Sequence, residues 1–187
     1  MQSVFQNAFD DAALLLEEFN SEATRETLSL FAASLLDTFR RRGKVLVCGN
    51  GGSMADSMHF AEEFSGRFRM DRAPLPVLAL SDPTHITCVG NDYGFDHIFS
   101  RQVEALGHSG DILVLLSTSG NSPNLLLAAT SAKSRSMTTV GLLGRDGGQL
   151  MSLCDLALVA PGATSDRIQE LHMMALHAVI EAVEAEL

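Results

Sequence analysis

Cysteine is scarce in this chain of 187 residues, and the three that occur, Cys48, Cys88 and Cys154, stand far apart. No CxxC pair is present, so neither a zinc ribbon nor a redox dithiol is indicated. A sparse, odd number of cysteines is typical of a reducing compartment rather than of secreted domains held by disulfides. The sequence therefore predicts a cytoplasmic protein.

Basic residues are also few, with 13 Lys and Arg against 23 Asp and Glu and a formal net charge of −10. A nucleic-acid surface needs clustered Lys and Arg, so we expect no nucleic-acid partner. The acidic balance does not exclude a small phosphorylated ligand, because backbone amides at a helix N-terminus hold phosphate without net positive charge.

Long apolar runs are missing, since no stretch approaches 18 uninterrupted apolar residues. A membrane partner is therefore not expected. The first twenty residues carry acids and no basic region, which is not the pattern of a signal peptide. With 46% hydrophobic and 19% charged residues, the composition indicates a folded globular chain, and we expect a single domain over residues 1–187.

Apolar residues recur at spacings of three and four in residues 2–19 and again in residues 22–42, which predicts two amphipathic helices. Three arginines at 40–42 suit the negative end of the second helix, and Gly43 provides the stop. We interpret residues 1–43 as an N-terminal helical extension. The apolar face of the first helix is compatible with packing between subunits, and equally with covering the sheet of its own subunit.

Five short apolar runs follow, with helical patterns between most of them. Several are apolar at consecutive positions, which is typical of strands covered on both faces. Strand–helix alternation predicts a parallel sheet with right-handed crossovers, and hence an α/β core over residues 44–187 that ends in a long amphipathic helix, Ser165–Leu187. The expected strands are Val45–Cys48, Val77–Leu80, Ile112–Leu116, Thr139–Leu143 and Leu156–Val159.

The loop after the first strand reads Gly49-Asn50-Gly51-Gly52-Ser53. Its glycines let the backbone approach a ligand closely, and Ser53 can cap the next helix and offer its hydroxyl. The loop is neither GxGxxG nor Walker A, and no Lys follows, so a nucleotide is weakly supported. An ordinary strand-to-helix turn is the alternative.

The loop after the third strand, Ser117-Thr118-Ser119-Gly120-Asn121-Ser122, holds four hydroxyls in six residues. Ser122 followed by Pro123 is typical of an N-cap and a first helical position. The alternative is a polar loop that only caps a helix. Because ligands of parallel sheets bind beyond the carboxyl ends of strands, the two loops together predict a neutral cradle for a phosphate monoester.

His59 and Glu63 stand four apart in a predicted helix and share one face, and Arg67 continues that face. Such a pair can bind a divalent metal or join a base to its orienting partner, although a plain surface pair is more common. In the last helix, Gln169 and His177 lie about 12 Å apart along the axis, so joint ligation of one ion is stretched unless their side chains reach together or different subunits contribute. Asn91-Asp92-Tyr93-Gly94 is interpreted as a turn.

Four segments together resemble the phosphoheptose isomerases, which are sedoheptulose 7-phosphate isomerases of the sugar-isomerase (SIS) fold: residues 49–53, 59–63, 117–122 and 166–170. The similarity runs over nearly the whole chain. The serine-rich loop alone is generic to SIS domains, whereas His59 and Glu63 with Gln169 and His177 are specific to the isomerase branch.

The resemblance implies a flavodoxin-like three-layer α/β sandwich with a five-stranded parallel sheet. It also implies a cytoplasmic homotetramer with active sites at subunit contacts. The implied reaction converts sedoheptulose 7-phosphate into D-glycero-D-manno-heptose 7-phosphate through an enediol, toward ADP-heptose for the lipopolysaccharide core.

Residue by residue, the resemblance implies that Glu63 and His177 are the catalytic base and acid. It implies one zinc ion per subunit, held by His59, Glu63, Gln169 and His177. A Glu committed to zinc is a poorer base, so metal binding and proton abstraction belong to different states if Glu63 does both. The implied substrate-binding residues are Asn50, Gly51, Gly52, Ser53, Glu63, Arg67, Asn91, Asp92, Ser117, Thr118, Ser119, Ser122, Asp166 and Gln169.

Two other functions stay open at this point. A related SIS protein binds the bacterial replication initiator without being an enzyme, but it lacks the acid at the position of Glu63 and the histidine at that of His177. A sugar-phosphate sensor would usually carry a helix-turn-helix segment, for which this chain has neither room nor a basic patch. The sequence assigns no role to His85 or His172.

Overall fold

The structure is a computed structural model that describes residues 1–187. The strands are β1 (Val45–Gly49), β2 (Val77–Ala79), β3 (Ile112–Ser117), β4 (Thr138–Gly144) and β5 (Leu156–Ala160). The helices are α1 (Gln2–Phe19), α2 (Glu22–Arg40), α3 (Gly52–Ser65), α4 (Pro83–Asp92), α5 (Ser100–Leu106), α6 (Pro123–Ser134) and α7 (Ser165–Glu184), with short 3-10 turns η1 (Phe95–His97) and η2 (Gln149–Ser152). All five predicted strands are present, with ends within one residue of those expected.

The five strands are parallel and lie in the order β2-β1-β3-β4-β5, which is the flavodoxin-like order. The chain leaves β1 toward β2 on one side and later returns to pair β3 on the other side. This reversal makes the carboxyl ends of β1 and β3 the topological switch point, where open α/β sheets bind their ligands. The loops at residues 49–53 and 117–122 both begin there.

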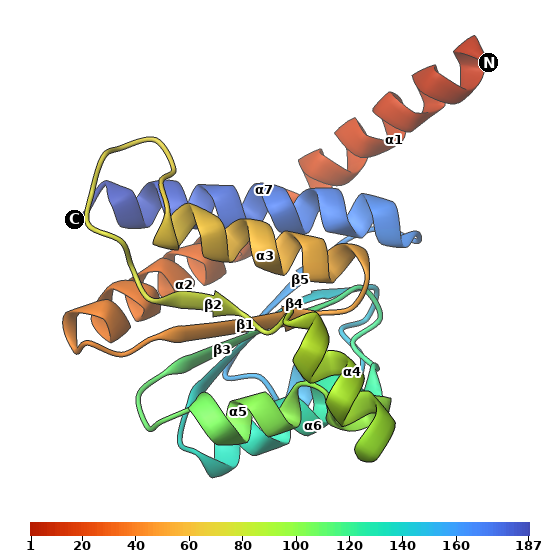
Figure 1. Ribbon diagram of the computed structural model, residues 1–187. Helices are drawn as coiled ribbons and strands as arrows, with labels where there is room; N and C mark the ends of the chain where they lie inside the picture. The colour runs from red at the N-terminus through yellow and green to blue at the C-terminus, as the bar shows by residue number, and fades with distance from the viewer.

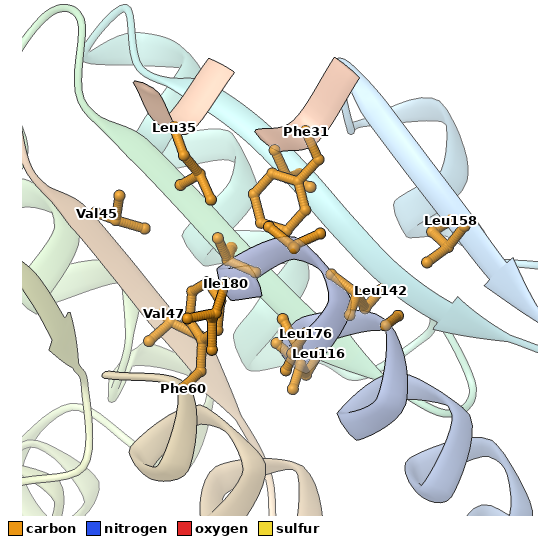
Figure 2. Packing of buried hydrophobic residues seen from close by; sticks show 14 of the residues in the cluster. Phe31, Leu35, Val45, Val47, Phe60, Leu116, Leu142, Leu158, Leu176 and Ile180 are labelled. Carbon is orange, nitrogen blue, oxygen red and sulfur yellow. The ribbon is translucent and has the colours of Figure 1, made fainter. Parts of the chain in front are cut away.

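Helices cover both faces of the sheet, with α2, α3 and α7 on one side and α4, α5 and α6 on the other (Figure 1). A hydrophobic core lies on each face of the sheet: the first under α2, α3 and α7, and the second under α4, α5 and α6. Residues of β1 alternate between them, since Val45 and Val47 lie in the first core and Leu46 and Cys48 in the second. Figure 2 shows the first core, where side chains of α2, α3 and α7 meet over the strands. The predicted three-layer sandwich is confirmed.

The two N-terminal helices differ in how they pack. In α2, Phe31 and Leu35 are buried in the first core, as their spacing predicts. Helix α1 instead projects from the body (Figure 1), and Phe5 and Phe9 are 62% and 75% exposed. The part of the apolar face that carries Phe5 and Phe9 therefore does not cover the sheet of its own chain, whereas Phe19 at the end of α1 joins the first core. No helix combines the length and apolar character needed to cross a bilayer.

The prediction of a turn at Asn91–Gly94 is wrong for the first two of these residues. Asn91 and Asp92 are the last residues of α4, and the chain turns only at Gly94, whose φ is 93°. Asp82 is the N-cap of this helix, because its carboxylate accepts a hydrogen bond of 2.7 Å from the His85 backbone amide. Gly90, directly before Asn91, favours a turn at this point of the sequence, but it stands inside the helix and does not end it.

Both histidines without an assigned role make structural hydrogen bonds. The His85 ring is 3.1 Å from the Ile98 carbonyl. His172, fully buried in α7, donates through Nε2 to the Leu143 carbonyl of β4 at 2.8 Å, and its Nδ1 has no partner. The second bond ties α7 to β4, next to the central strand of the sheet.

His172 predicts acid sensitivity. Burial lowers the pKa of His172 to about 4, against the opposing effect of the bond to Leu143, whereas an unfolded histidine titrates near 6.5. The folded state therefore binds fewer protons, so its stability is complete above about pH 6.5 and falls as the pH drops toward 4, by up to roughly 3 kcal/mol. The free energy of unfolding, measured with urea between pH 7.5 and 4.5, should fall less steeply with decreasing pH in His172→Gln than in the unaltered protein. The glutamine keeps a donor for the Leu143 carbonyl. Parallel plots of unfolding free energy against pH for the two proteins would contradict this.

Candidate active site

A polar pocket of about 160 Å³ lies at the switch point between β1 and β3. Apart from Leu116 its lining is made of hydroxyl and amide side chains, and no charged side chain contributes. The lining residues are Asn50, Ser53, Leu116, Ser117, Thr118, Ser122, Ser165 and Gln169. The pocket is therefore neutral, as the two loops predict.

Three helices begin at this pocket. Helix α3 starts at Gly52, α6 starts at Pro123 after the N-cap Ser122, and α7 starts at Ser165. The first N–H groups of a helix lack intrahelical partners and carry partial positive charge. None of the three N-caps uses its own side chain to satisfy them. Three helix starts around hydroxyl groups favour a phosphate group without any cationic side chain.

Ser53 does not cap α3, contrary to the expectation from sequence. The N-cap is Gly51, whose φ of 56° suits glycine. Ser53 lies buried in the first turn, and the Gln169 amide donates to its hydroxyl at 3.4 Å. This contact joins the start of α3 to α7 directly beside the pocket.

The serine-rich loop divides into two parts. Ser117, Thr118 and Ser122 line the pocket, whereas the Ser119 hydroxyl accepts a hydrogen bond of 3.2 Å from the Asn121 amide and is not part of the lining. Gly120 turns the loop at a φ of 64°, and a Cβ there would lie 1.9 Å from the Gly147 carbonyl oxygen. Only glycine fits at this crossing of two loops.

Two contributors were missed by the sequence reasoning. Ser165 lines the pocket and pairs with Thr118 at 3.0 Å between hydroxyls. Asn124 exchanges two side-chain hydrogen bonds with Asn50, at 3.0 and 2.8 Å, and so fixes the first loop against α6. Ser165 had a usable signal, because a serine preceded by Thr164 opens a long amphipathic pattern. Asn124 had none.

Farther along α3 and α7, His59, Glu63 and His177 come together. Glu63 Oε1 lies 3.3 Å from Nε2 of His59 and 3.5 Å from Nε2 of His177. The two imidazole rings meet edge to face with centroids 5.1 Å apart. A carboxylate between two imidazoles is an arrangement that can transfer protons or bind a cation.

The trio fits a divalent metal. One possible ligand atom from each residue lies within 4.8 Å of the other two. Glu63 is 7% exposed, and its Oε2 is buried without a hydrogen-bond partner. Glu63 Oε1 faces two imidazole nitrogens, and the other oxygen, Oε2, has no partner, so the carboxylate is suited to bind a cation. Gln169, the fourth ligand implied by the resemblance, instead directs its amide toward Ser53.

The other candidates lie outside the pocket within one chain. Arg67 is exposed beyond the end of α3. Asn91 and Asp92 hydrogen bond to each other at 2.7 Å on the exposed end of α4, in the opposite helical layer. Asp166 is exposed in the first turn of α7, where a hydrogen bond from the Thr164 side chain lowers its pKa. None of these four residues lines the pocket. Arg67 directly precedes Phe68, whose ring stacks on His177, so it is the one of the four that the fold brings toward the trio.

Comparison with known proteins gives concordant relatives. The SIS domain family model matches residues 9–144. A phosphoheptose isomerase of Fusobacterium nucleatum is 54% identical, covering 91% of this chain and 88% of that protein. One of Vibrio cholerae is 46% identical over 100% of this chain and 98% of that protein. The solved structure of phosphoheptose isomerase from Neisseria gonorrhoeae superposes with a TM-score of 0.93 and 39% identity, covering 98% of each chain.

Proposed function

Because this chain belongs to the phosphoheptose isomerase family of SIS-domain proteins, we propose that Glu63 and His177 perform the proton transfers of the reaction. The chain is an aldose–ketose isomerase. Its substrate is sedoheptulose 7-phosphate and its product D-glycero-D-manno-heptose 7-phosphate. The observation that carries the assignment of residues is the Glu63 carboxylate, which lies within 3.5 Å of two imidazoles on the helices that open at a phosphate-type pocket.

The reaction moves a proton between the first two carbons through an enediol. Glu63 is suited to remove the carbon-bound proton and return it to the neighbouring carbon, since one of its oxygens has no other partner. His177 is suited to carry the proton between the two substrate oxygens, because its Nε2 lies 3.5 Å from Glu63 while its ring is partly exposed. Base and acid therefore act from adjacent positions on different helices.

The neutral pocket holds the phosphate in this proposal. Ser53, Ser117, Thr118 and Ser122 offer hydroxyls, and the three helix starts offer amides. Asn50, Gly51, Gly52 and Gln169 lie at or beside the same pocket and would contact the nearest sugar oxygens. Ser119 would act through the shape of its loop. Holding the phosphate here leaves the other end of the sugar free to reach the trio farther along α3 and α7.

A zinc ion is part of the proposal, with His59, Glu63 and His177 as ligands. A metal here would polarise substrate oxygens or order the site. Gln169 would join only after its amide leaves Ser53.

We also propose a cytoplasmic location and a role in ADP-heptose synthesis for lipopolysaccharide. The replication-initiator and sensor alternatives are not favoured, because the relatives matched over nearly their whole length are isomerases.

Glu63→Gln should lower turnover by roughly 10²- to 10⁴-fold, because the amide cannot accept the carbon-bound proton. Binding of the sugar phosphate should change little, since the phosphate pocket is untouched. NMR detection of the aldose product measures turnover, and calorimetry measures binding. Glu62→Gln, an exposed neighbour, is the matched control. Near-normal turnover in Glu63→Gln would remove Glu63 as the base.

The metal proposal predicts one tightly bound zinc per chain in protein purified without chelator. His59→Gln should lower the zinc content and weaken zinc affinity by about 10-fold or more, because one of three ligands is lost. Elemental analysis and competition with a zinc-binding dye measure this without reference to activity. His97→Gln, an exposed histidine on η1, is the control. Equal zinc content in both variants would contradict the assignment.

We propose a homotetramer in which a second copy completes each site. The exposed apolar face of α1 supports association, as does the apolar groove that α1 forms with Leu171 and Met174 of α7. The position of Asn91 and Asp92 at the end of α4, in the helical layer opposite to α3 and α7, supports sharing of sites between subunits. Light scattering should give four chains for the unaltered protein and fewer for Phe9→Glu, while Gln6→Glu on the same helix stays tetrameric. A tetrameric Phe9→Glu protein would count against α1 as the contact.

A further inference from the structure

The segment between α3 and β2, residues 66–76, lies along the end of α7 and is called the strap below. It contacts α7 at three successive positions on one helical face. The Phe68 ring stacks on His177, Arg69 pairs with Glu181, and Arg72 pairs with Glu184. The strap follows directly from the helix that carries Glu63, so it connects the two proposed catalytic side chains by a second route besides the packing of α3 on α7.

Arg72 and Glu184 form the buried end of the strap. Their side chains are only 8% and 3% exposed, and Arg72 Nε donates to Glu184 Oε1 at 2.9 Å. The other carboxylate oxygen of Glu184 accepts the backbone amides of Arg69 and Met70, at 3.2 and 3.3 Å. A buried pair with this many additional bonds holds a defined geometry, whereas an exposed pair would not.

The same guanidinium reaches back to α3. It donates to the backbone carbonyl of Glu63 at 2.7 Å and to that of Phe64 at 2.8 Å. These carbonyls belong to the last turn of α3, which has no intrahelical partners for them, and a cation there is favoured by the helix dipole. One side chain thus fixes the backbone of Glu63 and binds a carboxylate that stands two turns beyond His177.

Phe68 acts on His177 itself. The two rings are nearly parallel, with centroids 5.9 Å apart and an interplanar angle of 17°. At its edge, Nε2 of the same imidazole lies 3.5 Å from Oε1 of Glu63. The stacked ring restricts rotation of the imidazole and keeps Nε2 directed at Glu63. Neither Phe68 nor Arg72 needs to touch a substrate to have this effect.

We propose that Arg72 and Phe68 are positioning residues, which through the strap fix the position of the Glu63 carboxylate relative to the His177 imidazole. This inference rests on the proposed roles of Glu63 and His177. Proton transfer depends steeply on geometry, and a shift of about 1 Å can cost on the order of 100-fold in rate. The strap therefore contributes to turnover more than to binding of the phosphate, which occurs at the opposite end of α3.

The test compares Arg72→Met and Arg72→Lys with Lys44→Met. Lys44 forms a partly buried pair with Asp111 at the amino ends of β1 and β3, away from the site, so its loss reports general destabilisation. At a temperature where all variants are folded, Arg72→Met should lower kcat by about 10- to 100-fold with KM within about threefold of the unaltered value. Arg72→Lys should have a kcat between those of Arg72→Met and the unaltered protein. Lys44→Met should have a lower Tm but an unchanged kcat.

A second measurement needs neither substrate nor metal. The Phe68 ring current should shift the imidazole proton signals of His177, which are assigned by their loss in His177→Gln. In Phe68→Leu and in Arg72→Lys these signals should move toward those of an unstacked histidine, while Lys44→Met leaves them unchanged. This readout also applies if Arg72→Met fails to fold.

Unchanged kcat in folded Arg72→Met, or unchanged His177 signals in Phe68→Leu, would overturn the positioning role. If the unaltered protein fails to convert the heptose phosphate, the proposed function is wrong, and the His177 signals alone then decide whether the strap orders this side chain.

Discussion

The packing of α3 against α7 is the interaction on which the site depends. The two helices lie side by side over the same face of the sheet (Figure 1) and share one hydrophobic core through Phe60, Phe64, Leu176 and Ile180. Both begin at the carboxyl edge of the sheet. Their starts therefore meet at the polar pocket, and the last turn of α3 meets the second half of α7, which brings Glu63 and His177 together although these residues are more than a hundred positions apart.

Glu63 combines burial with an incomplete set of partners. Most buried carboxylates satisfy their oxygens with hydrogen bonds, yet Oε2 of Glu63 has none. The surrounding structure holds this unfavourable group in place through the apolar packing of α3 and the hydrogen bond that Arg72 donates to the Glu63 carbonyl. An unsatisfied group held so firmly is typical of a site that awaits a ligand or a proton.

The fold could be read from the sequence because apolar runs such as residues 112–116 mark buried strands without ambiguity, and the strand-to-helix loops follow directly. The pocket could be located for the same reason, since parallel strands end at one edge. Phe68 and Arg72 could not be foreseen, because residues 66–76 have no periodicity and their partners on α7 lie over a hundred residues away. Helical spacing also could not show whether α1 covers its own sheet, because it identifies an apolar face but not what lies against it.

Because the phosphate pocket has no charged side chains, the electrostatic effect of the protein on a phosphate differs between long and short range. At a distance, an approaching dianion meets a molecule with a net charge of −10, which repels it. Within a few ångströms, the dipoles of three helix starts dominate and attract it. Capture of the ligand is therefore opposed by the surface as a whole, while its residence time is governed by oriented peptide groups that cannot titrate.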